Sequence, residues 1–69
     1  MASMKTVFAE LGDMPCRRCI NECFDVDLQP KDCRYFPYQA KCTACRANQN
    51  IVGGFTPSGR MKMLLARPR

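Results

Sequence analysis

The cysteine pattern constrains this chain more than any other feature. Two matching Cys-x2-Cys pairs, Cys16/Cys19 and Cys42/Cys45, are separated by 22 residues in a 69-residue sequence that contains no histidine. Two intervening residues let both sulfurs of a pair reach one ion at ~2.3 Å, and tetrahedral zinc takes four such ligands. A chain this short buries too little surface for a generous core, so it needs a metal, disulfides or a partner. The pattern predicts one structural zinc site.

The spacing leaves three alternatives to zinc open: free thiols with chance spacing, a disulfide framework, and an iron–sulfur site. The first 15 residues carry Lys5, Glu10 and Asp13 and show no secretory signal, so we expect reduced cysteines and a cytoplasmic location. No segment has the ~18 apolar residues of a membrane helix. Cys23 and Cys33 are expected to pack in the core, with a further metal ligand or a disulfide as the other readings.

The residue pattern predicts a single small α+β domain over residues 1–69, stabilised by metal. Apolar spacing favours short strands at Met4–Leu11 and at Phe24–Leu28, followed by an edge or irregular segment at Cys33–Tyr38. A helix of about two turns is expected after the second cysteine pair, over residues 43–50, with Thr43 as its cap. Residues 55–69 are expected to form a C-terminal β-hairpin, with a helical tail as the alternative.

The segment Met14–Asn50 resembles the treble-clef and zinc-ribbon modules of small bacterial and phage regulatory proteins. It covers about half of the chain. In treble clefs the first cysteine pair lies on a loop and the second pair opens a helix, so the resemblance implies this arrangement here. Zinc ribbons more often have glycine directly after each pair, where this sequence has Ile20 and Arg46. Nuclease versions of the module depend on histidine, so the resemblance implies metal binding and no nuclease activity.

Charge is distributed unevenly along the sequence. Residues 1–30 contain three basic and five acidic residues, whereas residues 31–69 contain eight basic residues and one acidic residue. A basic half suggests an acidic partner, and aromatic side chains can stack on unpaired bases. We therefore expect a regulator that contacts nucleic acid. The predicted nucleic-acid contacts are Arg34, Lys41, Arg46, Arg60, Lys62 and Arg67, with Tyr35 and Tyr38 as stacking residues and Phe36 assigned to the core.

Catalysis is not expected, because the sequence offers no histidine as a general base and no nucleophile triad. The alternative function is a protein-interaction module or inhibitor that docks on a larger nucleic-acid-processing enzyme or forms a homodimer. The apolar side chains of Met61, Met63, Leu64 and Leu65 favour this alternative, since methionine-rich surfaces adapt to partners. Closure of the domain's own core explains the same residues equally well.

Overall fold

The computed structural model describes residues 3–69, which form three α-helices and a two-stranded antiparallel sheet. The elements are α1 (Met4–Leu11), α2 (Arg17–Phe24), the 3-10 turn η1 (Pro30–Asp32), β1 (Cys33–Lys41), β2 (Asn48–Phe55) and α3 (Pro57–Met63). This confirms the predicted α+β class, although several elements differ from the prediction. Within the described range, every helix falls short of the length and apolarity needed to span a membrane.

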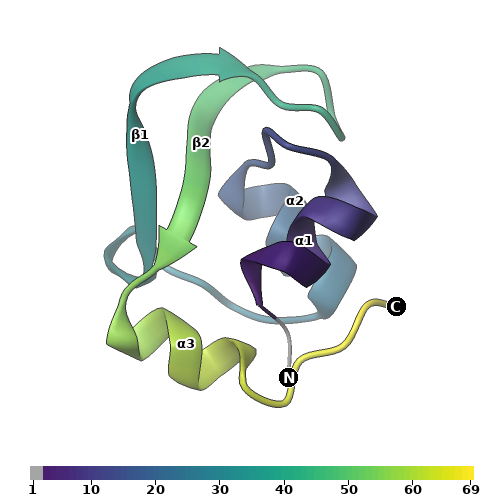
Figure 1. Ribbon diagram of the computed structural model, residues 1–69, viewed down its shortest axis with the longest axis vertical. Coiled ribbons are helices and arrows are strands. Elements are labelled where there is room, and N and C mark those ends of the chain that lie inside the picture. The colour runs from purple at the N-terminus through teal and green to yellow at the C-terminus, as the bar shows by residue number, and fades with distance from the viewer. Residues whose placement is uncertain (1–2) are drawn as a thin grey trace.

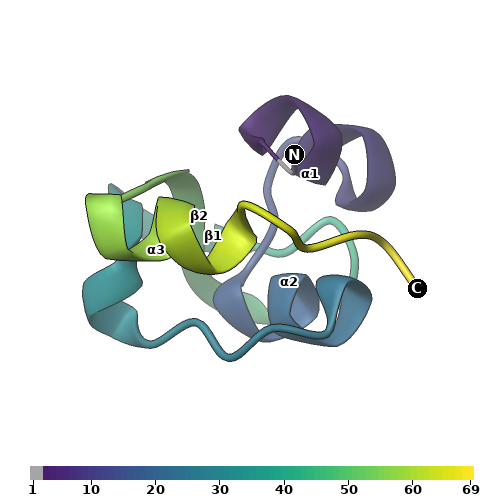
Figure 2. The same cartoon turned by 90° about the horizontal axis from the view of Figure 1, so that it is seen from below.

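The β1–β2 hairpin occupies one side of the molecule, and α1 and α2 lie beside it (Figure 1). The tip of the hairpin bends over toward these two helices, while α3 lies across the open end of the hairpin (Figure 1). The C-terminal tail runs from α3 back toward α2 (Figure 2), where the N–H of Arg69 donates to the carbonyl of Cys23 at 2.7 Å. The helices thus cover one side of the hairpin, and its other side is left open.

A single apolar core draws one or two residues from each helix and strand. Its buried members are Val7, Ile20, Phe24, Leu28, Cys33, Val52, Phe55 and Met63. A second, smaller buried cluster lies at the hairpin tip and contains Cys16, Cys19, Cys42 and Ile51. The chain therefore has two adjoining interiors, one apolar and one rich in sulfur.

The predicted strand at Met4–Leu11 is wrong, because this segment is helix α1. Met4, Val7, Phe8 and Leu11 recur with the period of a helix, and Val7 is fully buried between α1 and the core. The helix ends at Gly12, which adopts φ +89°, a conformation that favours glycine. The apolar stripe was present in the sequence, but it spans only two turns.

The predicted strand at Phe24–Leu28 is also wrong. Phe24 ends α2, and Asp25 takes a left-handed conformation (φ 54°) that turns the chain away from the helix. Leu28 is buried without a strand partner, because the side chain of Asn21 accepts from its N–H (2.8 Å) and donates to its carbonyl (3.2 Å). Arg17 donates a further hydrogen bond to the same carbonyl at 2.7 Å. Side chains of α2 replace the sheet hydrogen bonds here.

The edge or irregular segment expected at Cys33–Tyr38 is the first part of β1. Its pairing with β2 shifts register between Arg34 and Tyr35 and again between Tyr35 and Gln39, the stretch that contains Pro37. Proline has no N–H to donate, so a regular ladder cannot pass through this position. The irregularity was predictable, whereas the length of the strand on both sides of it was not.

The predicted C-terminal β-hairpin is wrong, and the helical alternative is correct for α3. Thr56 caps this helix, since its side chain accepts from the N–H of Gly59, and Pro57 occupies the first helical turn. Proline is favoured both at the first helical position and in tight turns, so the local sequence did not separate the two structures. Met63 is fully buried and closes the core from α3.

A buried carboxylate fastens α3 to η1. Asp32 accepts hydrogen bonds from the ammonium of Lys62 (2.7 Å), the hydroxyl of Ser58 (2.6 Å) and the N–H of Gln29 (2.8 Å). These donors hold the pKa of Asp32 well below its usual range. The backbone approach is so close that a Cβ at Gly59 would collide with the carbonyl oxygen of Asp32. Glycine at position 59 is therefore a packing requirement.

We expect Asp32→Asn to lower the melting temperature at pH 7 by several degrees, because it removes the charge that Lys62 contacts. The folded pKa of Asp32 is depressed, so its charge stabilises the fold above the unfolded pKa of about 3.9. That stabilisation is lost as the pH falls toward the folded pKa. The gap between wild type and variant, followed by circular dichroism, should be full above about pH 5 and shrink below about pH 4. The exposed Asp13→Asn control should show no such gap, and a gap as large at pH 2 as at pH 7 would contradict the assignment.

Candidate metal centre

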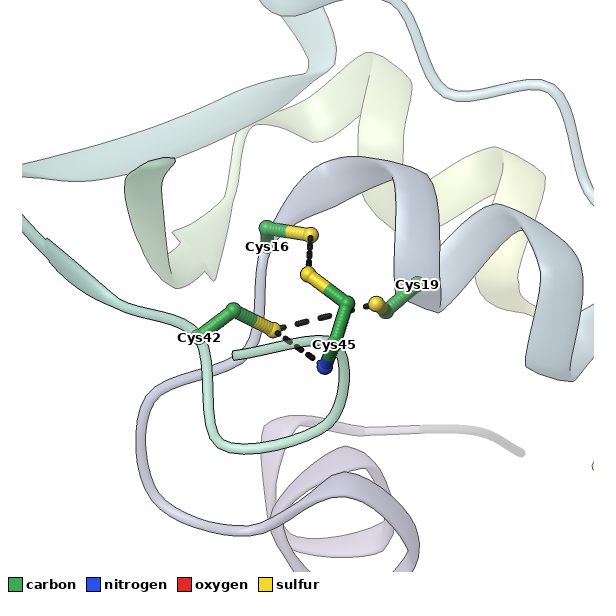
Figure 3. Close-up of side chains that lie close together, drawn as sticks. All are labelled: Cys16, Cys19, Cys42 and Cys45. Carbon is green, nitrogen blue, oxygen red and sulfur yellow. Dashed lines mark hydrogen bonds between the residues drawn. The ribbon is translucent and has the colours of Figure 1, made fainter. Parts of the chain in front are cut away.

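The four predicted ligands meet at one point although they come from distant parts of the chain (Figure 3). All four sulfur atoms lie within 4.8 Å of one another, with Cys16 Sγ 3.9 Å from Cys45 Sγ and Cys19 Sγ 3.7 Å from Cys42 Sγ. A tetrahedral ion with metal–sulfur distances of ~2.3 Å requires sulfur–sulfur edges of about 3.8 Å. The cysteines are therefore placed as for a metal site.

The first pair lies at the beginning of α2. Cys16 is the N-cap residue and Cys19 follows in the first turn, so the helix directs both sulfurs to the same side. Pairing with β2 fixes this segment, because Cys16 forms an antiparallel bridge with Ile51 and the N–H of Val52 donates to the carbonyl of Pro15 at 2.9 Å. The first pair is thus held by a contact with a strand that follows it by some 35 residues.

The second pair lies in the hairpin tip, residues 42–47, which we call the cysteine turn. The N–H groups of Ala44 and Cys45 point at Cys42 Sγ at 3.4 and 3.5 Å, and the N–H of Arg46 donates to the carbonyl of Cys42 at 2.8 Å. Arg46 has φ +64°, the left-handed conformation that closes the turn. The helix predicted for residues 43–50 is therefore wrong: the chain turns back through residues 42–47, and β2 begins at Asn48.

The two pairs have the reverse of the arrangement that the treble-clef resemblance implied. The first pair opens a helix, and the second pair lies in a loop between two strands. Thr43 is not a helix cap; its hydroxyl donates to the carbonyl of Leu11 at 2.6 Å and accepts from the N–H of Met14 at 3.3 Å. It thereby fastens the cysteine turn to the segment that precedes Cys16. Gly12 is needed beside it, since a Cβ there would lie 2.6 Å from Thr43 Oγ1.

Without a cation at its centre, the cluster disfavours four thiolates together. Burial raises the pKa of Cys16 and of Cys19, and the neighbouring sulfurs raise that of Cys19 further. Burial also opposes the thiolate of Cys42, but the N–H groups of Cys45 and Ala44 outweigh it and lower this pKa to about 6. Arg18 lies beside Cys45, whose sulfur raises the pKa of the guanidinium. One arginine cannot neutralise four adjacent thiolates, whereas a divalent ion at their centre offsets most of that charge.

Cys23 and Cys33 lie outside this cluster. Cys33 is buried in the apolar core and Cys23 packs against the same core, and burial raises the pKa of both thiols. All six cysteines are free, and the ligand groups of residues 3–69 gather at one place only. The structure therefore supports the packing role and brings neither residue to a second metal site.

The predicted nucleic-acid residues are distributed over the hairpin, α3 and the tail. Arg34, Lys41, Arg46, Arg60 and Arg67 are exposed. Lys62 is engaged by Asp32, which the sequence pattern did not reveal. Tyr38 is 56% exposed and Tyr35 is half-buried. Phe36, which we expected in the core, is 36% exposed and stacks on Tyr38 with ring centroids 5.9 Å apart.

Fold and site together define a small α+β domain with a four-cysteine cluster of the metal-binding type. No protein-family model matches the sequence, and no curated protein or solved structure matches it either. The case for a metal site therefore rests on sulfur geometry.

We expect the purified chain to carry one ion, seen by native mass spectrometry and identified as zinc or iron by elemental analysis. Cobalt should replace it and give the absorption of a tetrahedral four-thiolate complex. Cys42→Ser should lose the ion and most of the cooperative unfolding transition, because metal binding is coupled to folding. Cys23→Ser should retain the ion. The site would be refuted if the mass spectrum showed no bound metal and a chain mass lower by two or more protons, as disulfide formation would give.

Position 46 gives a separate test of the cysteine turn. Arg46→Ala keeps the left-handed strain, whereas Arg46→Gly removes it, and both variants lack the guanidinium. We expect the glycine variant to be more stable than the alanine variant by about 1 kcal/mol, measured by chemical unfolding at saturating metal. Equal stabilities would contradict a positive φ at this residue.

Proposed function

We propose that the chain is a zinc-stabilised binding module without enzymatic activity, which binds single-stranded nucleic acid on the open face of its β-hairpin. Four thiolates supply every ligand that tetrahedral zinc needs and leave no position for a reactive water. A centre of this type stabilises the fold and does not catalyse. The chain would then act as a regulator, through what it binds.

The observation that carries the proposal is the exposed pair of stacked rings on β1. Phe36 and Tyr38 lie with their planes only 12° apart, and Tyr38 is 56% exposed. An aromatic pair that serves only the core would turn inward, as Phe24 and Phe55 do. Rings in this position offer a surface on which unpaired bases stack, and each stacked base contributes about 1–3 kcal/mol.

The part of β2 beside the rings carries no side chains. Gly53 lies beside Phe36, since a Cβ at Gly53 would be 3.2 Å from Phe36 Cζ, and Gly54 lies beside Arg34. Because these two positions of β2 carry no side chain, nothing on β2 rises next to the rings there. A base or a ribose can therefore approach the hairpin closely.

Cations flank the rings along the hairpin. Arg34 precedes Phe36 by two residues on β1, Lys41 ends the strand, and Arg46 lies in the cysteine turn. All three are exposed, as phosphate contacts require. Lys62 is excluded from this set because Asp32 holds its ammonium, and half-buried Tyr35 is excluded from stacking.

We expect oligo(dT) or oligo(rU) to bind, measured by fluorescence anisotropy at two salt concentrations. Tyr38→Ala should weaken binding by about 5- to 150-fold, because it removes one stacking ring. Tyr38→Phe should bind nearly as the wild type does, since it keeps the ring. Arg34→Gln and Lys41→Gln should each lower the slope of log K against log salt by about 0.7.

Lys5→Gln is the matched control, because Lys5 is an exposed cation on α1, a helix that carries none of the proposed nucleic-acid contacts. It should leave affinity and salt slope nearly unchanged. The proposal would be refuted if blunt duplex DNA bound as tightly as the single-stranded oligonucleotides. It would also be refuted, in favour of a protein target, if neither Tyr38→Ala nor added salt changed the affinity.

A further inference from the structure

A second surface of the molecule is hollow and apolar, and it lies where α3 crosses the open end of the hairpin, next to the start of α1. The hollow has a volume of about 520 Å³, which is within the range of small-molecule sites. Its lining includes Met4, Arg34, Gly54, Arg60, Met61 and Leu64. They come from both strands and from two helices, so the site exists only in the folded chain.

Apolar side chains in the walls of this hollow are exposed to solvent and are not part of the buried core. Met61 is 72% exposed and Leu64 is 43% exposed, while Met63 between them is fully buried in the core. Helix α3 therefore presents apolar side chains both to the core and to the outside. Large apolar side chains gathered around a concave surface are typical of a ligand site.

Two arginines give the hollow its charge. Arg34 on β1 and Arg60 on α3 both line the hollow. Among residues 3–69 the ion pairs are Lys62–Asp32 and Arg69–Asp25, so both guanidinium groups of the hollow lack a carboxylate partner. Of the described residues, none that lines the hollow is acidic. A planar guanidinium binds a carboxylate through two parallel hydrogen bonds, which favours an anionic head group here.

We propose that this hollow binds an amphipathic carboxylate, an unbranched hydrocarbon chain that ends in one carboxyl group, of the class of medium-chain fatty acids. The chain lies against Met4, Met61 and Leu64, and the carboxylate lies against Arg60 and Arg34. A nucleic acid strand offers phosphate to the arginines but no hydrocarbon to the walls. Arg34 is therefore shared by the two surfaces, whereas Arg60 and the apolar walls belong to this site alone.

The probe is octanoate, titrated into the metal-loaded chain and followed by isothermal calorimetry and by amide shifts in nuclear magnetic resonance spectra. Hexanoate, octanoate and decanoate, all below micellar concentrations, should bind with increasing affinity, by up to about fourfold for each buried methylene. 1-Octanol should bind more weakly, and octyltrimethylammonium should not bind. If the cation binds as tightly as octanoate, or no compound binds, the proposal is overturned.

Variants locate the binding. Gly54→Val should block octanoate, because Gly54 lines the hollow and the larger side chain would fill it. The fold should tolerate the substitution, because a Cβ at Gly54 would make only ordinary contacts, the nearest at 3.9 Å from Arg34. Met61→Ser should weaken binding with little risk to the fold, since Met61 is 72% exposed. Arg60→Gln should weaken it about tenfold, while Arg67→Gln, outside the hollow, should not.

Tyr38→Ala separates this site from the nucleic-acid surface. It should bind octanoate like the wild type although it loses oligonucleotide. Unchanged octanoate affinity in both Met61→Ser and Arg60→Gln would overturn the proposed site.

Discussion

The four-cysteine centre is the interaction on which the rest of the structure depends. It joins the start of α2 to the tip of the hairpin, two parts of the chain that local forces would not bring together. A core of eight buried residues gives a 69-residue chain little stability to spare. A single ion bound by both pairs would remove much of the conformational freedom that folding must otherwise overcome. The hydrogen bonds of Thr43 act in the same place and fix the orientation of the two pairs.

The opposite end of the hairpin is fastened by different chemistry. There the buried carboxylate of Asp32 gathers donors from η1 and α3, and Gly59 lets the two backbones meet. The apolar core lies between this network and the sulfur cluster. The hairpin is therefore held at both ends.

This division explains how so small a fold can offer two surfaces. The face of β1 with its stacked rings is supported from behind by the core, so exposing Phe36 and Tyr38 costs the fold little packing. The hollow beside α3 arises because Met63 alone fills the core from that helix, which leaves Met61 and Leu64 outside. Rigid support beneath a binding surface reduces the entropy that is lost on binding.

The sequence pattern predicted the wrong structure for several segments, because apolar spacing and turn residues do not separate a helix from a strand or a turn over two helical turns or fewer. The helical stripe of α1 is too short to exclude a strand, and Pro57 suits a turn as well as a helix start. Residues 43–50 have reasonable helix propensity, but the hydrogen bonds of the cysteine turn and the pairing of β2 override it. Leu28 resembles a strand residue, yet Asn21 and Arg17 satisfy its backbone.

The sequence by itself determined the chemistry of the centre, because the two-residue spacing within each pair is a local property that suits one ion in any fold. It also predicted the α+β class, although not which segments form the helices, and it predicted the break in β1 at Pro37. Only the tertiary structure decided which pair begins a helix, since that depends on the contact of Cys16 with Ile51. It also decided that Lys62 is bound to Asp32 while Arg34 and Arg60 are free of ion pairs within residues 3–69. Side-chain exposure and pairing are set by residues far apart in the chain, and no local pattern encodes them.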